Sequence, residues 1–208
     1  MARTAGSHGP ATMEAIRAAG LRLIFEHGYE SMSLRRLAAE VGIQVGSLYN
    51  HISTKQALLF DLIDAHMRAL LAELEKALHG IDAPDDRLRA FVAFHVSYHI
   101  LRKREVFISY SELRSLEPDN YAAIVRMRRR YEDALVAILQ QGVATGDFSL
   151  GNQRVVAFGI LAMLTGVCTW FQPGGRLTAD EVIAIYTNVV LSGVLRSCAG
   201  SLNRSDHQ

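Results

Sequence analysis

The chain has 208 residues, half of them hydrophobic, and a formal net charge of +1. This length and composition suffice for one large or two small packed domains, which excludes disorder for most of the chain. The near-neutral charge excludes a surface that is generally attractive to polyanions, so any contact with nucleic acid must be local. Prolines are few and no segment sustains the alternation of a β-strand, which predicts an all-α fold.

The first ten residues, which end at Gly9 and Pro10, predict a flexible arm and contain no apolar run typical of a signal peptide. A helix is expected from Thr12 to His27, where apolar side chains recur at helical spacing, and Gly28 ends it. We expect this helix to brace the short helices that follow, because two short helices cannot bury a core alone.

The stretch from Ser33 to Lys55 has the apolar spacing of a helix-turn-helix unit. Ala38 is small where two helices would cross, and Gly42 falls where the chain must reverse. The second helix is expected over Gln44–His51 and would lie in the major groove of duplex DNA. The same spacing occurs in helical proteins with no DNA role. However, residues 41–55 contain no acid, and Gln44, Ser47, Tyr49, Asn50 and His51 can bond to base edges or phosphates, which favours a DNA-binding surface.

A long helix is expected from Thr54 to about His79, with Ser53 as its N-cap and Gln56 completing a capping box. At 1.5 Å per residue, this helix spans roughly 35–40 Å. One end would lie against the helix-turn-helix and the other would reach into the rest of the chain. The helix is therefore expected to link the two mechanically.

Five more helices bring the expected total to nine. They are expected over Asp85–Arg102, Glu105–Ser115, Asp119 or Asn120 to Ala144, Asn152–Phe171 and Thr178–Arg196. A second capping box, formed by Thr178 and Glu181, begins the last of them.

Over residues 11–60 the chain resembles the TetR family of repressors. The matching features are Gly28-Tyr29, Ser33-Leu34-Arg35, Leu37-Ala38, Val41-Gly42-Ile43, Ser47-Leu48-Tyr49, His51, Lys55 and Ala57-Leu58-Leu59. Asn50 and Ile52 depart from the aromatic residues that the family often has there, which bears on the operator sequence. The resemblance implies a three-helix DNA-binding domain with a flexible arm over residues 1–56. It also implies a larger helical ligand-binding and dimerisation domain over residues 57–208.

The resemblance also implies which residues contact double-stranded DNA. Arg35 would enter the groove and pair with a guanine edge, which is worth about 1–3 kcal/mol of discrimination. Tyr49, His51 and Lys55 suit phosphate contacts. The complete expected set is Arg35, Val45, Gly46, Ser47, Tyr49, Asn50, His51 and Lys55.

A ligand cavity inside the second domain is implied in the same way. Aromatic side chains at helical spacing often form only core, but Tyr98 and His95 carry polar groups that need partners if they are buried. The expected ligand-binding residues are His66, Phe91, His95, Tyr98, Phe107, Tyr110, Met163 and Trp170.

The sequence leaves the class of effector open. Residues 170–178 resemble the end of the ligand domain in TetR regulators of fatty-acid and sterol breakdown, several of which respond to acyl-CoA thioesters. Arginines around residues 102–104 and 126–130 could hold the phosphates of such an effector, or could be solvated charges. An apolar or aromatic drug-like effector is the alternative.

Catalysis, cofactors and metals are not expected. No nucleophile elbow, phosphate-binding loop or dinucleotide fingerprint is present. His95 and His99 are four residues apart, but no third ligand has convincing spacing, and Val96 excludes the HExxH motif. Cys168 and Cys198 show no pairing pattern and are expected to be free thiols, so we expect a cytoplasmic protein.

The last two helices are expected to form a homodimer interface. Val155–Phe171 and Glu181–Leu195 are apolar over most of their circumference, more than a single core stripe requires. The 17-residue run to Phe171 is shorter than the roughly 20 residues of a membrane span, so no membrane partner is expected. The sequence thus favours a homodimeric repressor that a small-molecule effector releases from a palindromic operator. The alternative is a helical small-molecule-binding protein or enzyme with a vestigial helix-turn-helix.

Overall fold

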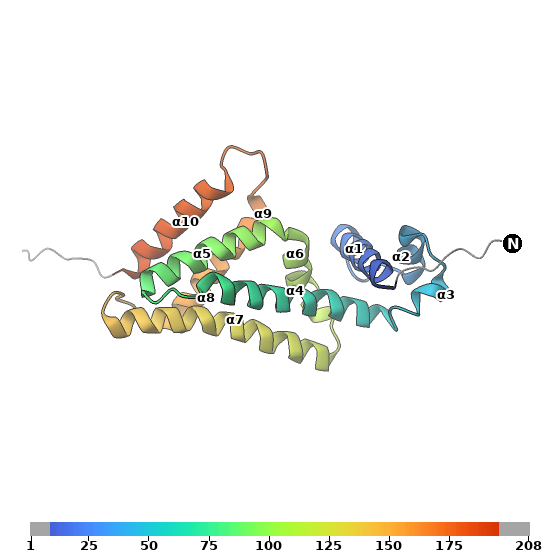
Figure 1. The fold of residues 1–208 in the computed structure, drawn as a ribbon, viewed down its shortest axis with the longest axis horizontal. Coiled ribbons are helices and arrows are strands. Elements are labelled where there is room, and N and C mark those ends of the chain that lie inside the picture. The colour runs from blue at the N-terminus through green and yellow to red at the C-terminus, as the bar shows by residue number, and fades with distance from the viewer. Residues whose placement is uncertain (1–8, 196–208) are drawn as a thin grey trace, which may run out of the picture. The chain divides into compact units, whose positions relative to one another are not determined.

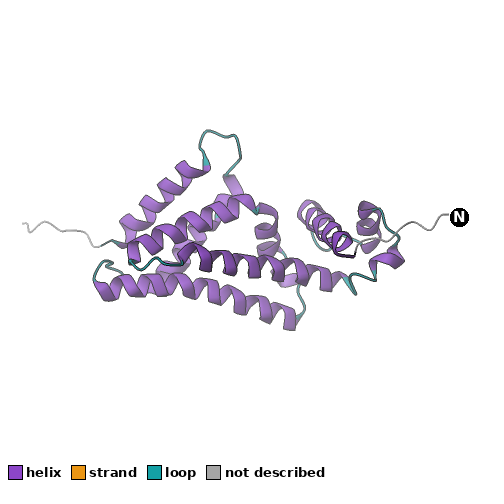
Figure 2. Ribbon diagram, viewed as in Figure 1, coloured by secondary structure: helices purple, strands orange, loops and turns teal. Residues whose placement is uncertain are grey.

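The computed structural model describes residues 9–195 (Figure 1). These residues form ten α-helices and one short 3-10 helix, and no strand occurs among them (Figure 2). Phe148 and Leu195 form an isolated antiparallel bridge. The all-α prediction is confirmed. The predicted arm before Gly9, the predicted helix end at Arg196, Cys198 and the polar tail lie outside the described residues.

The chain divides into two compact units, and the first comprises residues 1–74 and 98–131. In it α1 packs against α2 and α6. Ile16, Ile24, Leu37 and Leu48 are fully buried in its core. Its elements are α1 (Gly9–His27), α2 (Leu34–Val41), α3 (Val45–Leu48), the first part of α4 (Lys55–Leu78), α6 (Lys103–Ser111), η1 (Leu113–Ser115) and the start of α7 (Pro118–Thr145).

The second unit comprises residues 75–97 and 132–208. Phe91, Val92, Leu135, Leu139 and Leu164 are fully buried in its core. It contains most of α5 (Pro84–Leu101), the rest of α7, and then α8 (Gln153–Thr165), α9 (Val167–Trp170) and α10 (Ala179–Val194). The predicted domain boundary after residue 56 stays a prediction.

Local sequence signals place most helix ends. Gly42 ends α2 with φ +74° and Gly146 follows α7 with φ +83°, left-handed conformations that favour glycine. The Asn152 side chain accepts hydrogen bonds from the backbone at the start of α8. Thr178 and Glu181 form the predicted capping box of α10.

Several predicted boundaries are wrong, including those of α3 and of the helix predicted over Glu105–Ser115, which is α6 followed by η1. Thr54, rather than Ser53, caps α4, because its Oγ1 accepts a hydrogen bond of 2.9 Å from the Ala57 backbone. The helix predicted over Asn152–Phe171 is divided at Gly166 into α8 and α9. Glycine weakens a helix interior by roughly 0.5–1 kcal/mol relative to alanine, so a break in the helix at Gly166 costs little free energy.

One stretch among the described residues, Gln153–Trp170, is long and apolar enough to cross a membrane by length and composition alone. Its mean hydropathy is 1.4, and 28% of it is buried.

Candidate nucleic-acid interface and ligand residues

The turn between α2 and α3 is built from local hydrogen bonds. Ser33 caps α2, and its Oγ accepts from the Arg36 backbone N–H at 3.2 Å. At the other end, the Gly42 and Ile43 backbone N–H groups donate to the Ala39 and Ala38 carbonyls at 3.2 and 3.0 Å. These bonds satisfy carbonyls that would be unpaired at a helix end, and they reverse the chain toward α3.

Helix α3 is held by one buried side chain, and its Gly46 and Ser47 are exposed. It runs only from Val45 to Leu48, shorter than the predicted Gln44–His51, and Leu48 is fully buried. Turns follow it, with the His51 backbone donating to the Leu48 carbonyl at 2.9 Å. The side chains exposed around it are polar or small, and none is acidic. They belong to Gln44, Gly46, Ser47, Tyr49 and Asn50.

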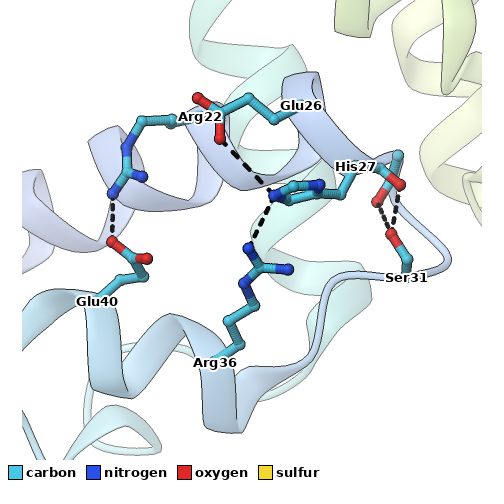
Figure 3. Close-up of polar contacts among 7 residues, drawn as sticks. Arg22, Glu26, His27, Ser31, Arg36 and Glu40 are labelled. Carbon is cyan, nitrogen blue, oxygen red and sulfur yellow. Dashed lines mark hydrogen bonds and ion pairs between the residues drawn. The ribbon is translucent and has the colours of Figure 1, made fainter.

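Two adjacent arginines on α2 have different surroundings. Arg35 is exposed and forms no hydrogen bond or ion pair with any residue between 9 and 195. Arg36 donates to His27 Nε2 at 2.8 Å (Figure 3). Arg35 is therefore available to a ligand, whereas Arg36 connects α2 to α1.

Further polar contacts hold α1 against α2. Arg22 forms an ion pair with Glu40, and this hydrogen bond lowers the pKa of the Glu40 carboxyl (Figure 3). Ser31 Oγ donates to the His27 carbonyl after the end of α1. The helix that was predicted to brace the helix-turn-helix does pack against α2.

Lys55 lies at the start of α4, as predicted, but its ammonium group has partners within the chain. Nζ donates to the Glu30 carbonyl at 3.0 Å and lies 4.2 Å from the centroid of the Tyr29 ring. An ammonium group has three donors, so this bond leaves donors for a phosphate. Burial raises the pKa of the Tyr29 hydroxyl.

The sequence did not predict how α6 and η1 contact α1, the residues that follow it and the start of α4. The Phe25 and Phe107 rings meet edge to face with centroids 5.1 Å apart. Gln56 Nε2 donates to the Ser115 carbonyl at 2.6 Å. The Tyr29 backbone donates to Glu112 Oε1 at 3.3 Å. Only the aromatic character of Phe107 signalled a contact, and the sequence did not identify its neighbour.

Three of the expected ligand-binding residues are not in an interior. Phe107, Tyr110 and Trp170 are each about half exposed. Phe107 contacts α1 instead, Tyr110 stacks on the guanidinium of Arg128 with 4.3 Å to the ring centroid, and Trp170 meets Tyr186 edge to face. Helical spacing alone cannot distinguish a surface aromatic from a cavity wall.

Two pairs of expected ligand-binding residues do come together. In the first unit, the Tyr98 hydroxyl lies 3.4 Å from His66 Nδ1, and burial lowers the pKa of His66 to about 3. Burial raises the pKa of Tyr98. In the second unit, Phe91 and His95 are buried neighbours, and His95 Nε2 lies 3.2 Å from Thr165 Oγ1.

Two other observations bear on ligands. Met163, on α8, is half-buried. The part of the chain that the structure describes contains no group of three His, Cys, Asp or Glu side chains arranged to hold a metal.

A helix-turn-helix whose second helix presents a polar, acid-free face defines a DNA-binding transcriptional regulator. Residues 16–62 match the bacterial regulatory proteins of the tetR family, and residues 82–194 match the tetracyclin repressor-like, C-terminal domain. The chain belongs to the TetR family.

Relatives with this architecture match most of the chain. The HTH-type transcriptional repressor KstR2 of Mycolicibacterium smegmatis is 27% identical over 176 residues, covering 83% of this chain and 85% of KstR2. A tetR-family regulatory protein from Rhodococcus RHA1 has a TM-score of 0.83 at 27% identity, covering 91% and 98% of the two chains. The crystal structure of AibR with isovaleryl coenzyme A and operator DNA has a TM-score of 0.79 at 28% identity, covering 86% and 97%.

Proposed function

We propose that this protein is a cytoplasmic repressor that binds a palindromic operator as a homodimer and releases it when an acyl-CoA thioester binds. The observation that carries the DNA-binding part is the exposed, acid-free surface around α3, anchored by buried Leu48 and flanked by Arg35, whose side chain has no partner in the described part of the chain. Such a surface suits a polyanion, and base-edge contacts can come from Arg35 and Asn50. Binding, rather than catalysis, is its proposed activity.

Two helices of the second unit support a homodimer. Val155 and Phe158 on α8 are 63% and 46% exposed, and Ile185 and Val189 on α10 are 48% and 53% exposed. These residues recur at helical spacing, so each helix has an apolar face that its own unit leaves uncovered. A two-fold dimer through these faces would present two copies of α3 to a palindrome.

The acyl-CoA part draws on relatives and on residues of the second unit. AibR was crystallised with isovaleryl coenzyme A and operator DNA, and KstR2 is a transcriptional repressor. In this chain, the buried Phe91 ring lies next to the His95 ring, and His95 Nε2 lies 3.2 Å from Thr165 Oγ1. That combination suits an acyl chain whose thioester carbonyl needs one hydrogen-bond donor.

An operator titration tests the proposal. Duplexes selected from a random library are measured by fluorescence anisotropy with the full chain, first alone and then with isovaleryl coenzyme A, free coenzyme A or biphenyl. The thioester should raise the Kd for the operator at least tenfold, and operator should weaken thioester binding by the same factor. Thr165→Val, which keeps the side-chain shape, should reduce this response and leave operator binding unchanged.

Three other outcomes of the titration would each overturn one part of the proposal. Failure to enrich any palindrome would overturn the DNA-binding proposal. Release by biphenyl and not by the thioester would replace the acyl-CoA effector with an apolar one. Release by free coenzyme A would show that the acyl group does not carry recognition.

A further inference from the structure

A cleft of about 330 Å³ lies within the first unit, between α1, α4 and the residues that join α5 to α6. Glu14, Arg17, Ala18 and Leu21 line it from α1, and their spacing places them on one face of that helix. The α4 wall extends from Leu62 to Ala69, which is about 10 Å along a helix axis. The cleft therefore has the size of a small-molecule site.

The walls of the cleft are apolar and built from small side chains. Ala18 on α1 faces Ala65 and Ala69 on α4, and Leu21 and Leu62 supply the larger apolar surface. Alanines leave open space that longer side chains would fill. His66 is buried beneath them and is neutral near pH 7, because burial lowers its pKa to about 3.

The charges at the rim favour a cation. Arg17 is bonded to Asp61 through two contacts of 2.7 Å, and Arg102 to Glu73 at 2.8 Å. Each guanidinium is thus neutralised by a carboxylate next to the cleft. The side chains of the remaining rim carboxylates, Glu14 and Glu105, form no hydrogen bond or ion pair with any other described residue, and the charge of Glu14 contributes to raising the pKa of Arg17.

We propose that this cleft, which His66 and Tyr98 of the expected ligand-binding set help to line, is an effector site separate from the one that contains Phe91, His95 and Thr165. Its proposed ligand is a small organic cation that has an ammonium group on an aryl or short alkyl body. The apolar body would lie against Ala18, Ala65 and Leu62, and the ammonium would lie between Glu14 and Glu105. Coenzyme A thioesters are excluded because their phosphates would meet the same carboxylates. Binding at the cleft does not depend on the proposed acyl-CoA response or on DNA binding.

A ligand in this cleft would contact α1, which packs against α2, and α4 beside the Arg17–Asp61 pair. Occupancy would therefore alter operator affinity if the distance between α1 and α4 differs between the DNA-bound and free states. This consequence rests on the proposed function, whereas binding at the cleft is measured on the protein alone.

The binding test uses a cation and its uncharged isostere on the full chain. Benzyltrimethylammonium and neopentylbenzene have the same shape and differ in charge, and phenylacetate supplies the opposite charge. Saturation-transfer NMR and calorimetry should give one saturable cation site per chain, with at least tenfold weaker binding of neopentylbenzene and none of phenylacetate. Equal affinity for the cation and the isostere, or no binding of the cation, overturns the proposal.

Variants locate the site. Glu14→Gln combined with Glu105→Gln should weaken cation binding at least tenfold, and Ala65→Leu should abolish it by filling the cleft. Ala18→Leu fills the cleft from α1 and serves if Ala65→Leu does not fold. Glu75→Gln, which neutralises an exposed carboxylate of α4 outside the cleft, is the matched control and should change nothing. Unchanged binding in the cleft variants places the cation elsewhere and overturns the assignment.

Discussion

Arg17 on α1 and Asp61 on α4 form a bidentate ion pair, with both nitrogen–oxygen distances at 2.7 Å. The two residues are 44 positions apart in the sequence, so the pair connects the first helix to the long helix. The hydrogen bond to Asp61 is the main reason why the pKa of Arg17 is raised. The side chains are 39% and 31% exposed, so solvent screens part of their attraction.

Asp61→Asn should therefore lower the free energy of unfolding by about 1 kcal/mol, the upper end for a partly exposed pair with bidentate geometry. Chemical denaturation measures the change, and a double-mutant cycle with Arg17→Gln isolates the pair. Asp64→Asn is the control, since Asp64 pairs with Arg68 within α4 and the Arg68 side chain is 72% exposed. A larger loss from Asp64→Asn than from Asp61→Asn would contradict the connecting role of Arg17 and Asp61.

Arg35→Ala should relax the operator preference at one base pair and cost about 1–3 kcal/mol of binding to the preferred sequence. The reason is that an exposed guanidinium without a partner among residues 9–195 can pair with a guanine edge. Anisotropy titrations against operators with single substitutions measure the effect. Arg68→Ala removes an equally charged side chain from α4, and its operator profile should match the unmodified protein. A uniform loss across all sequences would instead make Arg35 a phosphate contact.

Tyr49→Ala should weaken binding by a similar factor on every duplex, because a phosphate contact carries no sequence information. The side chain is 55% exposed, directly after buried Leu48, so its removal should not disturb the core. The melting temperature checks that point. Tyr49→Phe isolates the hydroxyl and should show most of the loss if the hydroxyl bonds to a phosphate. If Tyr49→Ala instead changed the ratio of the affinities for different duplexes, Tyr49 would be a base contact.

His66 should make the fold less stable in mild acid. Its pKa is about 3 in the folded chain, compared with 6.5 ordinarily, because burial and the charges of His99, Arg102 and Arg128 disfavour the imidazolium. Below about pH 6.5 the unfolded chain binds a proton that the folded chain does not, so stability falls by up to about 1.4 kcal/mol per pH unit down to about pH 3. Above about pH 6.5, His66 is neutral in both the folded and the unfolded chain, so this loss of stability is absent.

Denaturant titrations between pH 7.5 and 5 measure this slope as the difference between the unmodified chain and His66→Gln. The variant should lose less stability on acidification, by about 2 kcal/mol at pH 5. His79→Gln, an exposed histidine at the end of α4, should keep the full slope. Identical slopes in His66→Gln and the unmodified chain would mean that His66 is not buried in neutral form.

Features determined by neighbouring residues could be predicted from the sequence, and those determined by distant contacts could not. Gly42 and the Thr178 capping box follow from backbone geometry within a few residues. The sequence misplaces the cap of α4 because Ser53 and Thr54 can both cap a helix, and the expected box partner, Gln56, bonds to Ser115 instead. Phe107 was recognisable as aromatic, but its partner Phe25 belongs to another helix.

The candidate site divides in the same way. The DNA surface is local, so residues 41–55 alone suggest a polar, acid-free face around a buried Leu48. A ligand site depends on which helix faces pack together, and that is set by contacts between residues such as His95 and Thr165, 70 positions apart. No periodicity within one helix contains that information.

Val189→Glu should separate the proposed dimer. Val189 and Ile185 on α10 are about half exposed, as is Phe158 on α8, so a carboxylate at this face costs the single chain little. In an interface it would be buried without a partner, which typically costs several kcal/mol. Light scattering and analytical ultracentrifugation should show a dimer for the unmodified chain and a monomer for Val189→Glu at micromolar concentration. The operator affinity of Val189→Glu should also be lower than that of the unmodified chain, because a monomer presents a single α3 to the two half-sites.

Two further variants distinguish an interface from an incidental apolar face. Tyr121→Glu places the same charge on an exposed aromatic residue of α7 and should leave the dimer intact. Gly159→Ala adds a methyl group to α8 where no other atom of the described residues lies within 4 Å. In a single chain this stabilises the helix by roughly 0.5–1 kcal/mol, whereas at a close contact between two helices it weakens association. Two results together would contradict an interface formed by α8 and α10. In one, Gly159→Ala is more stable and associates as tightly as the unmodified chain. In the other, Val189→Glu remains a dimer.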